Sequence, residues 1–199
     1  PATASAWSAA SSAIWPPVFT PRPHERYEPF PLTEVQHAYW IGRNVGFELS
    51  GVACQGYLEI ESHDLDLTRF RIAWQKIHDR HDMLNAVVLP DGRQRVLPEE
   101  TRVSRDVVVV DLRSEPLEVA RRVIEATRGR LSHAMCVPEE GPFMRAEVTL
   151  LADGSAVLHL NVDLLVMDYA SVRMVLADLR RFYEDPGLNL PKVALSFRD

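Results

Sequence analysis

Two carboxylates, Asp163 and Asp168, stand on either side of four apolar residues in the stretch DLLVMDYAS. The first closes a run that alternates like a β-strand, and the second stands where a helix is predicted to begin. Burying a carboxylate costs free energy unless a hydrogen bond or an opposite charge compensates for it. The spacing therefore indicates either structural carboxylates or a functional site.

The residues alone favour structural roles for both aspartates. Asp168 could cap the following helix, a contact that stabilises a helix by about 1 kcal/mol. Asp163 shares the predicted strand face with His159 and Asn161, and this face could be a polar seam against an arginine or the wall of a channel. A metal site is not expected, because two carboxylates at this spacing supply too few ligands for a hard cation.

A second cluster, Arg80 and His81 in RHDML, closes a predicted long helix. Cations at this end of a helix complement its dipole, which is a sufficient structural reason for them. Arg80 could also bind a buried aspartate through both of its terminal nitrogens.

The third cluster is PLTEVQHAYWIGR, where Thr33 and Gln36 form a capping box that starts a short helix. Tyr39 and Arg43 could line an entrance, or the helix could simply cover a sheet. The residues leave both interpretations open.

The elements around these clusters predict an α+β fold with a largely antiparallel sheet flanked by helices. Residues 1–26 are rich in Ala, Ser and Pro and are interpreted as a linker or tail, with the globular part starting near Tyr27. The pattern predicts helices over 34–41, 67–81, 117–131 and 168–184, a strand over 56–62, a buried strand over 107–112, and hairpins over 85–97 and 143–163. The hairpins are expected to turn at Asp-Gly pairs.

Composition excludes several classes of protein. A net charge of −6 and a pI of about 5.7 argue against a nucleic-acid-binding protein. No apolar run reaches the ~18 residues of a membrane span, and the N-terminal residues lack the pattern of a signal peptide. Cys54 and Cys136 are expected to be reduced thiols in a cytoplasmic protein.

The three clusters resemble core motifs of the heterocyclization domains of nonribosomal peptide synthetases. FPLTEVQHAYWIGR is similar to the motif FPLTxxQxAYxxGR, RHDML to RHxML, and DLLVMDYAS to DxxxxDxxS through Asp163, Asp168 and Ser171. The motifs occur in the family's order, and the resemblance covers residues 27–199.

The last motif also separates related domains. Condensation domains carry HHxxxDG here, and alignment on the final Asp places Asp163 and Leu164 at the two His positions. Leucine can neither accept nor donate a proton, so the histidine-based mechanism is not available. The resemblance therefore favours heterocyclization over condensation or epimerization.

The resemblance implies a chloramphenicol-acetyltransferase-like sandwich lobe, of which this chain has the N-terminal copy and lacks the C-terminal one. The family joins a carrier-bound acyl or aminoacyl donor to carrier-bound Cys, Ser or Thr and then cyclodehydrates the product to a thiazoline or oxazoline. The alternatives are a carrier-protein interaction module without chemistry of its own and a condensation-type acyltransferase. Family habit suggests a siderophore assembly line.

The resemblance also assigns roles. It places Asp163 and Asp168, the catalytic candidates, where donor and acceptor tunnels meet, and there we expect them to hold the loop rather than to transfer protons. At least one should pair with an arginine such as Arg80 or Arg43. The remaining motif and tunnel candidates are Ser171, Leu164, Tyr39, Arg43, Arg80 and His81.

The expected partners are upstream and downstream peptidyl or aryl carrier domains, the C-terminal lobe and an adjacent adenylation domain. We expect this lobe to bind no cofactor, because phosphopantetheine arrives on the carriers. Among variants, we expect Asp168→Ala to be more harmful than Asp163→Glu, since alanine removes both the cap and the charge.

Overall fold

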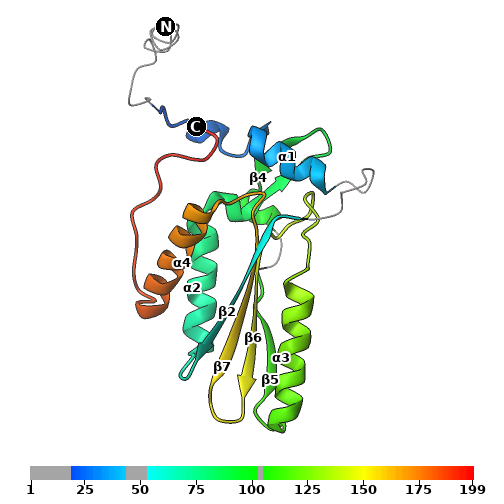
Figure 1. Ribbon diagram of the computed structural model, residues 1–199. Coiled ribbons are helices and arrows are strands. Elements are labelled where there is room, and N and C mark those ends of the chain that lie inside the picture. Colours follow the sequence, from blue (N-terminus) through cyan, green and yellow to red (C-terminus); the bar gives the residue numbers. More distant parts are fainter. Residues whose placement is uncertain (1–18, 44–52, 103–104) are drawn as a thin grey trace, which may run out of the picture.

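The computed structural model describes residues 19–43, 53–102 and 105–199 (Figure 1). Its helices are α1 Glu34–Gly42, α2 Leu67–Arg80, α3 Leu117–Leu131 and α4 Tyr169–Glu184. Its strands are β1 Phe30–Pro31, β2 Gln55–Ser62, β3 Ala86–Val88, β4 Arg93–Val96, β5 Val108–Leu112, β6 Met144–Leu151 and β7 Ala156–Asp163. Short 3₁₀ turns cover Pro23–Glu25, Asp82–Asn85 and Glu99–Thr101.

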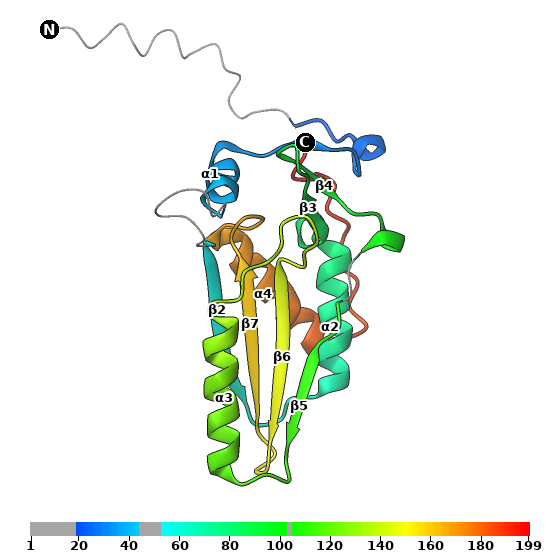
Figure 2. The same cartoon turned by 90° about the vertical axis from the view of Figure 1, so that its right-hand side faces the viewer.

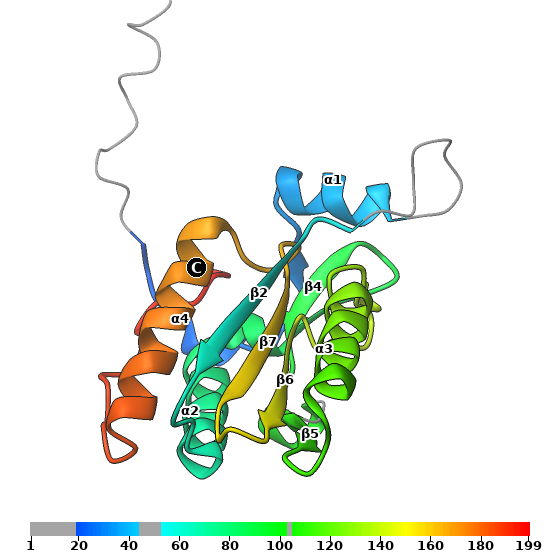
Figure 3. The same ribbon diagram turned by 60° about the horizontal axis from the view of Figure 1, so that its bottom comes forward.

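The main sheet has the strand order β2-β7-β6-β5. The first three strands pair antiparallel and β5 runs parallel to β6, so the predicted α+β fold with a largely antiparallel sheet is confirmed. Helices α2 and α4 cover one face and α3 covers the other (Figures 2 and 3). The strand predicted over residues 107–112 is present as β5, but its predicted burial was wrong, because β5 is an edge strand and Val108 is 54% exposed.

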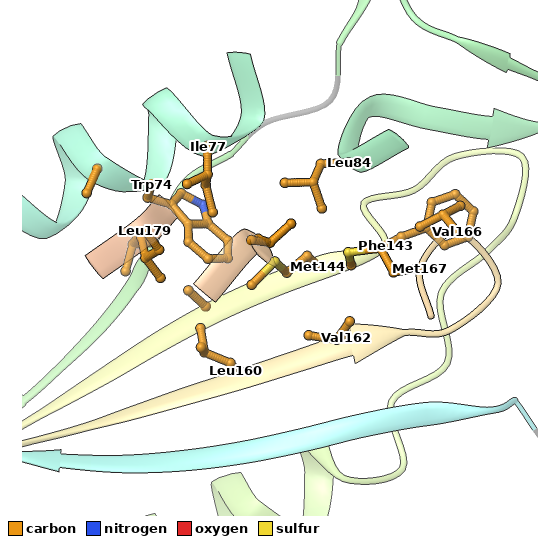
Figure 4. Packing of buried hydrophobic residues seen from close by; sticks show 14 of the residues in the cluster. Trp74, Ile77, Leu84, Phe143, Met144, Leu160, Val162, Val166, Met167 and Leu179 are labelled. Atoms are coloured by element: carbon orange, nitrogen blue, oxygen red, sulfur yellow. The ribbon is translucent and has the colours of Figure 1, made fainter. Parts of the chain in front are cut away.

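The core lies between the sheet and the pair α2 and α4. Leu160 and Val162 of β7 face Trp74 and Ile77 of α2 and Leu179 of α4 (Figure 4). The alternation of β7 places these apolar residues on one face, as the sequence predicted. Each large apolar side chain buried in this way contributes roughly 1.5–3 kcal/mol of transfer free energy.

The opposite face of β7 is polar and lies under α3. His159 is fully buried and bonds through Nδ1 to the Tyr57 hydroxyl at 2.6 Å and through Nε2 to the Thr149 hydroxyl at 3.3 Å. Asn161 donates to the Leu131 carbonyl at the end of α3, at 2.8 Å. This face is therefore a polar seam in which buried groups find hydrogen-bond partners.

Most of the predicted turns and helix ends are present in the structure. Gly92 and Gly154 adopt φ values of 79° and 83° at the two hairpin turns, a backbone region that favours glycine. Helix α2 ends at Arg80, so Leu84, an apolar residue seven positions after Ile77, lies in the 3₁₀ turn that follows the helix. Leu84 still reaches the core, because the turn packs against α2 and β4.

The first and last described segments lie side by side (Figure 1). The Arg22 N–H donates to Asp199 at 3.1 Å, and Arg198 forms an ion pair with Glu25 at 2.5 Å. Residues 19–26, which fall in the predicted linker, therefore contact the C-terminal segment, whereas residues 1–18 lie outside the described part. In the part of the chain that the structure describes, none of the helices has the length and apolar character needed to cross a membrane.

Candidate active-site loop

The site is built on the loop that joins β7 to α4 and carries both motif aspartates. Asp163 is the last residue of β7, and Asp168 is the residue that caps α4. Leu165, Val166 and Met167 between them are buried in the core, where Figure 4 shows the last two beside Phe143. These three apolar residues therefore anchor the loop in the core, and they also contribute to the lining of a groove beside it.

Asp163 is 1% exposed and forms an ion pair with Arg43, which follows α1. The same carboxylate oxygen, Oδ1, accepts a hydrogen bond from the Leu165 N–H at 2.9 Å. Arg43 also donates to the Cys136 carbonyl at 3.4 Å. The expected pairing of a motif aspartate with Arg43 is thus present, and it ties the first motif to the last.

This buried pair is not fully satisfied. Within the described residues, Asp163 Oδ2 and Arg43 Nε have no hydrogen-bond partner. An uncompensated buried polar atom lowers stability and is common at functional sites. The pair is therefore a sensitive point of the fold.

Asp168 has a different environment, since its side chain is exposed and caps α4. Its carboxylate accepts from the Ser171 N–H at 2.7 Å. Hydrogen bonds from the Ser171 side chain and backbone lower the pKa of Asp168 and so favour its charged form. The second Asp and the Ser of the DxxxxDxxS pattern thus belong to one helix cap.

Within the described residues, Arg80 and His81 form no hydrogen bond or ion pair with either motif aspartate, and Arg43 is the arginine that meets the expected pairing. Arg80 and His81 both bind Asp178 of α4, through Arg80 Nε at 2.8 Å and His81 Nε2 at 3.0 Å. Arg80 also donates to the Pro191 carbonyl at 2.5 Å, and burial lowers the pKa of His81 despite the Asp178 carboxylate. The RHDML motif therefore joins α2, α4 and the C-terminal segment.

Asp178 is a residue of this site that the sequence analysis missed. It is 6% exposed and occurs on the buried side of α4, between Val175 and Leu179. A charged residue on the apolar stripe of a helix was the available signal, because such a residue requires a partner.

Tyr39 and Leu164 are both neighbours of Cys54, near the Asp163 end of the loop. The neighbouring Cys54 thiol, through hydrogen bonding and then charge, raises the pKa of Tyr39. The Leu164 N–H donates to the Cys54 carbonyl at 2.9 Å. Near the same end of the loop, burial and then the charge of Asp163 raise the pKa of Cys136 to about 12, so that this thiol stays protonated.

A groove of about 970 Å³ borders the loop. The residues that line it come from the start of α1, the end of α2, the loop, the start of α4 and the C-terminal segment, and they include Gln36, Arg80, His81, Leu165, Asp168 and Ser171. Asp163, Arg43, Tyr39 and Leu164 do not line it. Four of the candidate residues, Asp168, Ser171, Arg80 and His81, therefore line the groove, whereas the other four lie outside it.

The donor set does not favour a metal. No cluster of three or more His, Cys, Asp or Glu side chains within the described ranges could hold a metal ion. The chemistry open to these residues is hydrogen bonding, electrostatics and positioning.

Comparison with known proteins places this geometry in a family. The condensation-domain family model matches residues 27–199. The chain belongs to the condensation-domain family. It corresponds to the N-terminal lobe of such a domain, which confirms the lobe expected from the motifs.

The relatives of this condensation-domain lobe include pyochelin synthetase PchF of Pseudomonas aeruginosa, which is 37% identical over 92% of the chain. Phenyloxazoline synthase MbtB of Mycobacterium sp. (strain MCS) is 36% identical over 85% of it. The crystal structure of the EpoB cyclization-docking bidomain from Sorangium cellulosum superposes with a TM-score of 0.84 at 35% identity, over 91% of this chain. The chain spans 10% of PchF, 14% of MbtB and 36% of the EpoB chain.

Proposed function

We propose that this chain is the N-terminal lobe of a heterocyclization domain. Within a larger synthetase, the complete domain would join a carrier-bound acyl or aminoacyl donor to carrier-bound Cys, Ser or Thr and cyclodehydrate the product to a thiazoline or oxazoline. The observation that carries the proposal is Leu164, which stands at the place of the condensation histidine beside the ion-paired Asp163. The names of the relatives, a phenyloxazoline synthase and a cyclization bidomain among them, agree with it.

The geometry supports a positioning role for the lobe. The buried Asp163–Arg43 pair fixes the start of the loop, and the Asp168 cap fixes its end. Each aspartate makes these contacts through Oδ1, which supports a structural role for both rather than proton transfer. Holding two thioester-bound substrates against each other can by itself supply a large part of a rate enhancement.

The partners and substrates follow from this role. Upstream and downstream carrier domains would bring their phosphopantetheine-bound substrates to the junction, and a C-terminal lobe would supply its opposite wall. The groups that close the ring would come from that second lobe. A phenyloxazoline synthase among the relatives supports an aryl-capped product of the kind found in siderophore assembly.

A second function from a different class is supported by the same contacts. Since both aspartates are structurally engaged, the chain on its own could act only as a surface for carrier domains, without chemistry. We therefore expect residues 1–199 alone to form no product from two loaded carriers.

The test uses the full synthetase with a loaded donor carrier and carriers loaded with Cys, Ser or Thr. Mass spectrometry separates the linear amide from the heterocycle, which is lighter by one water molecule. The proposal predicts heterocycle as the main product, and linear amide alone would overturn it.

Leu164→His in the same synthetase distinguishes heterocyclization from a condensation domain that has lost its histidine. A histidine next to the buried ion pair would need a partner or a changed pKa. We expect no gain of linear amide and a loss of both products. A clear gain of linear amide would favour the condensation interpretation.

A further inference from the structure

Gln94 of β4 is a fully buried polar residue that belongs to none of the three motifs. Its strand is the central one of a small sheet with the order β1-β4-β3, and it pairs there with Phe30 and Val88. The strand alternates between exposed and buried residues, and Gln94 takes a position on the buried side that apolar residues usually fill. A buried amide at such a place is expected to have a specific partner.

That partner is Gln36, the capping-box residue of α1. Gln94 Nε2 donates to Gln36 Oε1 at 2.8 Å, and Gln36 Nε2 donates to Gln94 Oε1 at 3.0 Å. Gln94 Nε2 also donates to the Pro31 carbonyl at 3.1 Å, and Gln36 Oε1 accepts from the Thr33 N–H at 3.0 Å. The two amides thus fix each other's orientation.

The pair reaches the loop between the two motif aspartates. Gln36 Nε2 donates to the Leu165 carbonyl at 2.9 Å, while the Leu165 N–H donates to Asp163 at 2.9 Å. Both peptide groups of Leu165 are therefore held, one by Gln36 and one by Asp163. Because the loop has only four residues between Asp163 and Asp168, a shift at Leu165 would move the whole segment.

We propose that Gln94, acting through Gln36, is a positioning residue for the loop 163–168 and for the two substrates that meet beside it. Gln94 fixes the Gln36 amide, Gln36 holds the Leu165 carbonyl, and Leu165 sets the path from Asp163 to Asp168. The reactive role of this loop rests on the proposed function, whereas the positioning of the loop does not.

The test compares three variants of the full synthetase. Gln94→Met keeps the volume of the side chain and removes all of its hydrogen bonds. Gln36→Glu keeps the capping box, for which Glu is a favoured residue, but its carboxylate cannot donate to Leu165. Thr127→Val is the matched control, since it removes a buried hydrogen bond to Glu147 on the other face of the main sheet.

Hydrogen–deuterium exchange of the peptide spanning the loop is the first readout and needs no activity. We expect exchange to be at least tenfold faster in Gln94→Met and Gln36→Glu, with α2 as protected as in the wild type. Thr127→Val should leave the loop unchanged. Wild-type protection of the loop in both glutamine variants would overturn the inference, and so would equal loosening of α2 and the loop.

Product formation at saturating loaded carriers is the second readout, counted as linear amide plus heterocycle. We expect kcat for total product to fall about tenfold or more in both glutamine variants while KM for the carriers stays unchanged. A linear amide as the only wild-type product would refute heterocyclization and still leave this test valid. An unchanged kcat with a loosened loop would show that the loop does not position the substrates.

Discussion

The two motif aspartates have the same chemistry and opposite surroundings. Asp163 is 1% exposed, lies at the end of a central strand and carries the charge that balances Arg43. Asp168 is exposed and caps a helix, where water can replace part of its hydrogen bonding. The difference shows that the spacing of two carboxylates does not give them a shared role, because burial decides how much each contact contributes to stability.

The largest effect we predict is that of Arg43→Met. Removing one partner of a buried ion pair leaves an uncompensated charge and typically costs about 3–5 kcal/mol of unfolding free energy. Urea denaturation of the chain measures it, with Arg180→Met as the matched control, because the Arg180–Glu184 pair is exposed and should contribute less than about 1 kcal/mol. Equal losses in the two variants would show that the Asp163 side of the loop is not specially sensitive.

His78 extends the comparison, because it is a buried ionisable group that forms no ion pair within the part of the chain that the structure describes. Burial lowers its pKa from 6.5 to about 4, and its Nδ1 contacts the Trp74 carbonyl at 2.8 Å. The unfolded chain therefore binds more protons between pH 6.5 and 4, so stability falls as pH falls through this window. We expect a loss of about 2 kcal/mol between pH 7.5 and 5 from this residue.

Denaturation of the wild type and of His78→Gln at both pH values tests this. The variant should lose that part of the pH dependence, while the smaller contributions of His81 and His159, whose pKa values burial also lowers, remain. The same pH dependence in both proteins would contradict the assignment to His78.

The smallest effect concerns Asp168. We expect Asp168→Ala to lose about 1 kcal/mol with the cap, and Asp168→Asn to lose almost nothing, because Asn caps helices as well as Asp does. The lowered pKa of Asp168 means that its charged contribution is present above the unfolded pKa and is lost as the pH falls through the folded one. Denaturation measures both variants.

The same Asn variant tests proton transfer. Asn cannot exchange a proton, so full activity of Asp168→Asn in the synthetase is expected if the residue only holds the helix. A loss of heterocycle with unchanged stability would give Asp168 a chemical role instead.

The contrast between the aspartates also predicts an order for stability that differs from the order expected from sequence for cyclisation in the parent protein. Asp168→Ala was expected to be the more harmful change, since it removes a cap and a charge. Asp163→Glu now carries the larger expected loss of stability, because an extra methylene must fit into a closely packed buried pair and typically costs about 1–3 kcal/mol. Exposure, which decides the order, is not visible in the spacing of two aspartates.

Local signals explain what could be predicted. The capping box of Thr33 and Gln36, the Asp-Gly turns and the cap at Asp168 depend on residues at most three positions apart. The alternation of β7 similarly separated its apolar and polar faces before the fold was known.

Long-range pairing explains what could not be predicted. Asp178 meets Arg80 across 98 residues, and Gln94 meets Gln36 across 58. Neither contact follows from periodicity or from a motif, since each depends on how α1, α2, α4 and the small sheet pack. The edge position of β5 has the same origin, because the order of strands in the sheet is a tertiary property.

The most direct test of the account is a double-mutant cycle on the unfolding free energy of the chain, with Arg43→Met combined in turn with Asp163→Asn and with Asp168→Asn. A buried pair in direct contact should show a coupling energy of about 2 kcal/mol or more, whereas sites without a shared contact should be additive within about 0.5 kcal/mol. The account predicts the first value for residues 43 and 163 and the second for residues 43 and 168. Additivity in both cycles, or equal coupling in both, would contradict the separation of the two aspartates into a buried anchor and an exposed helix cap.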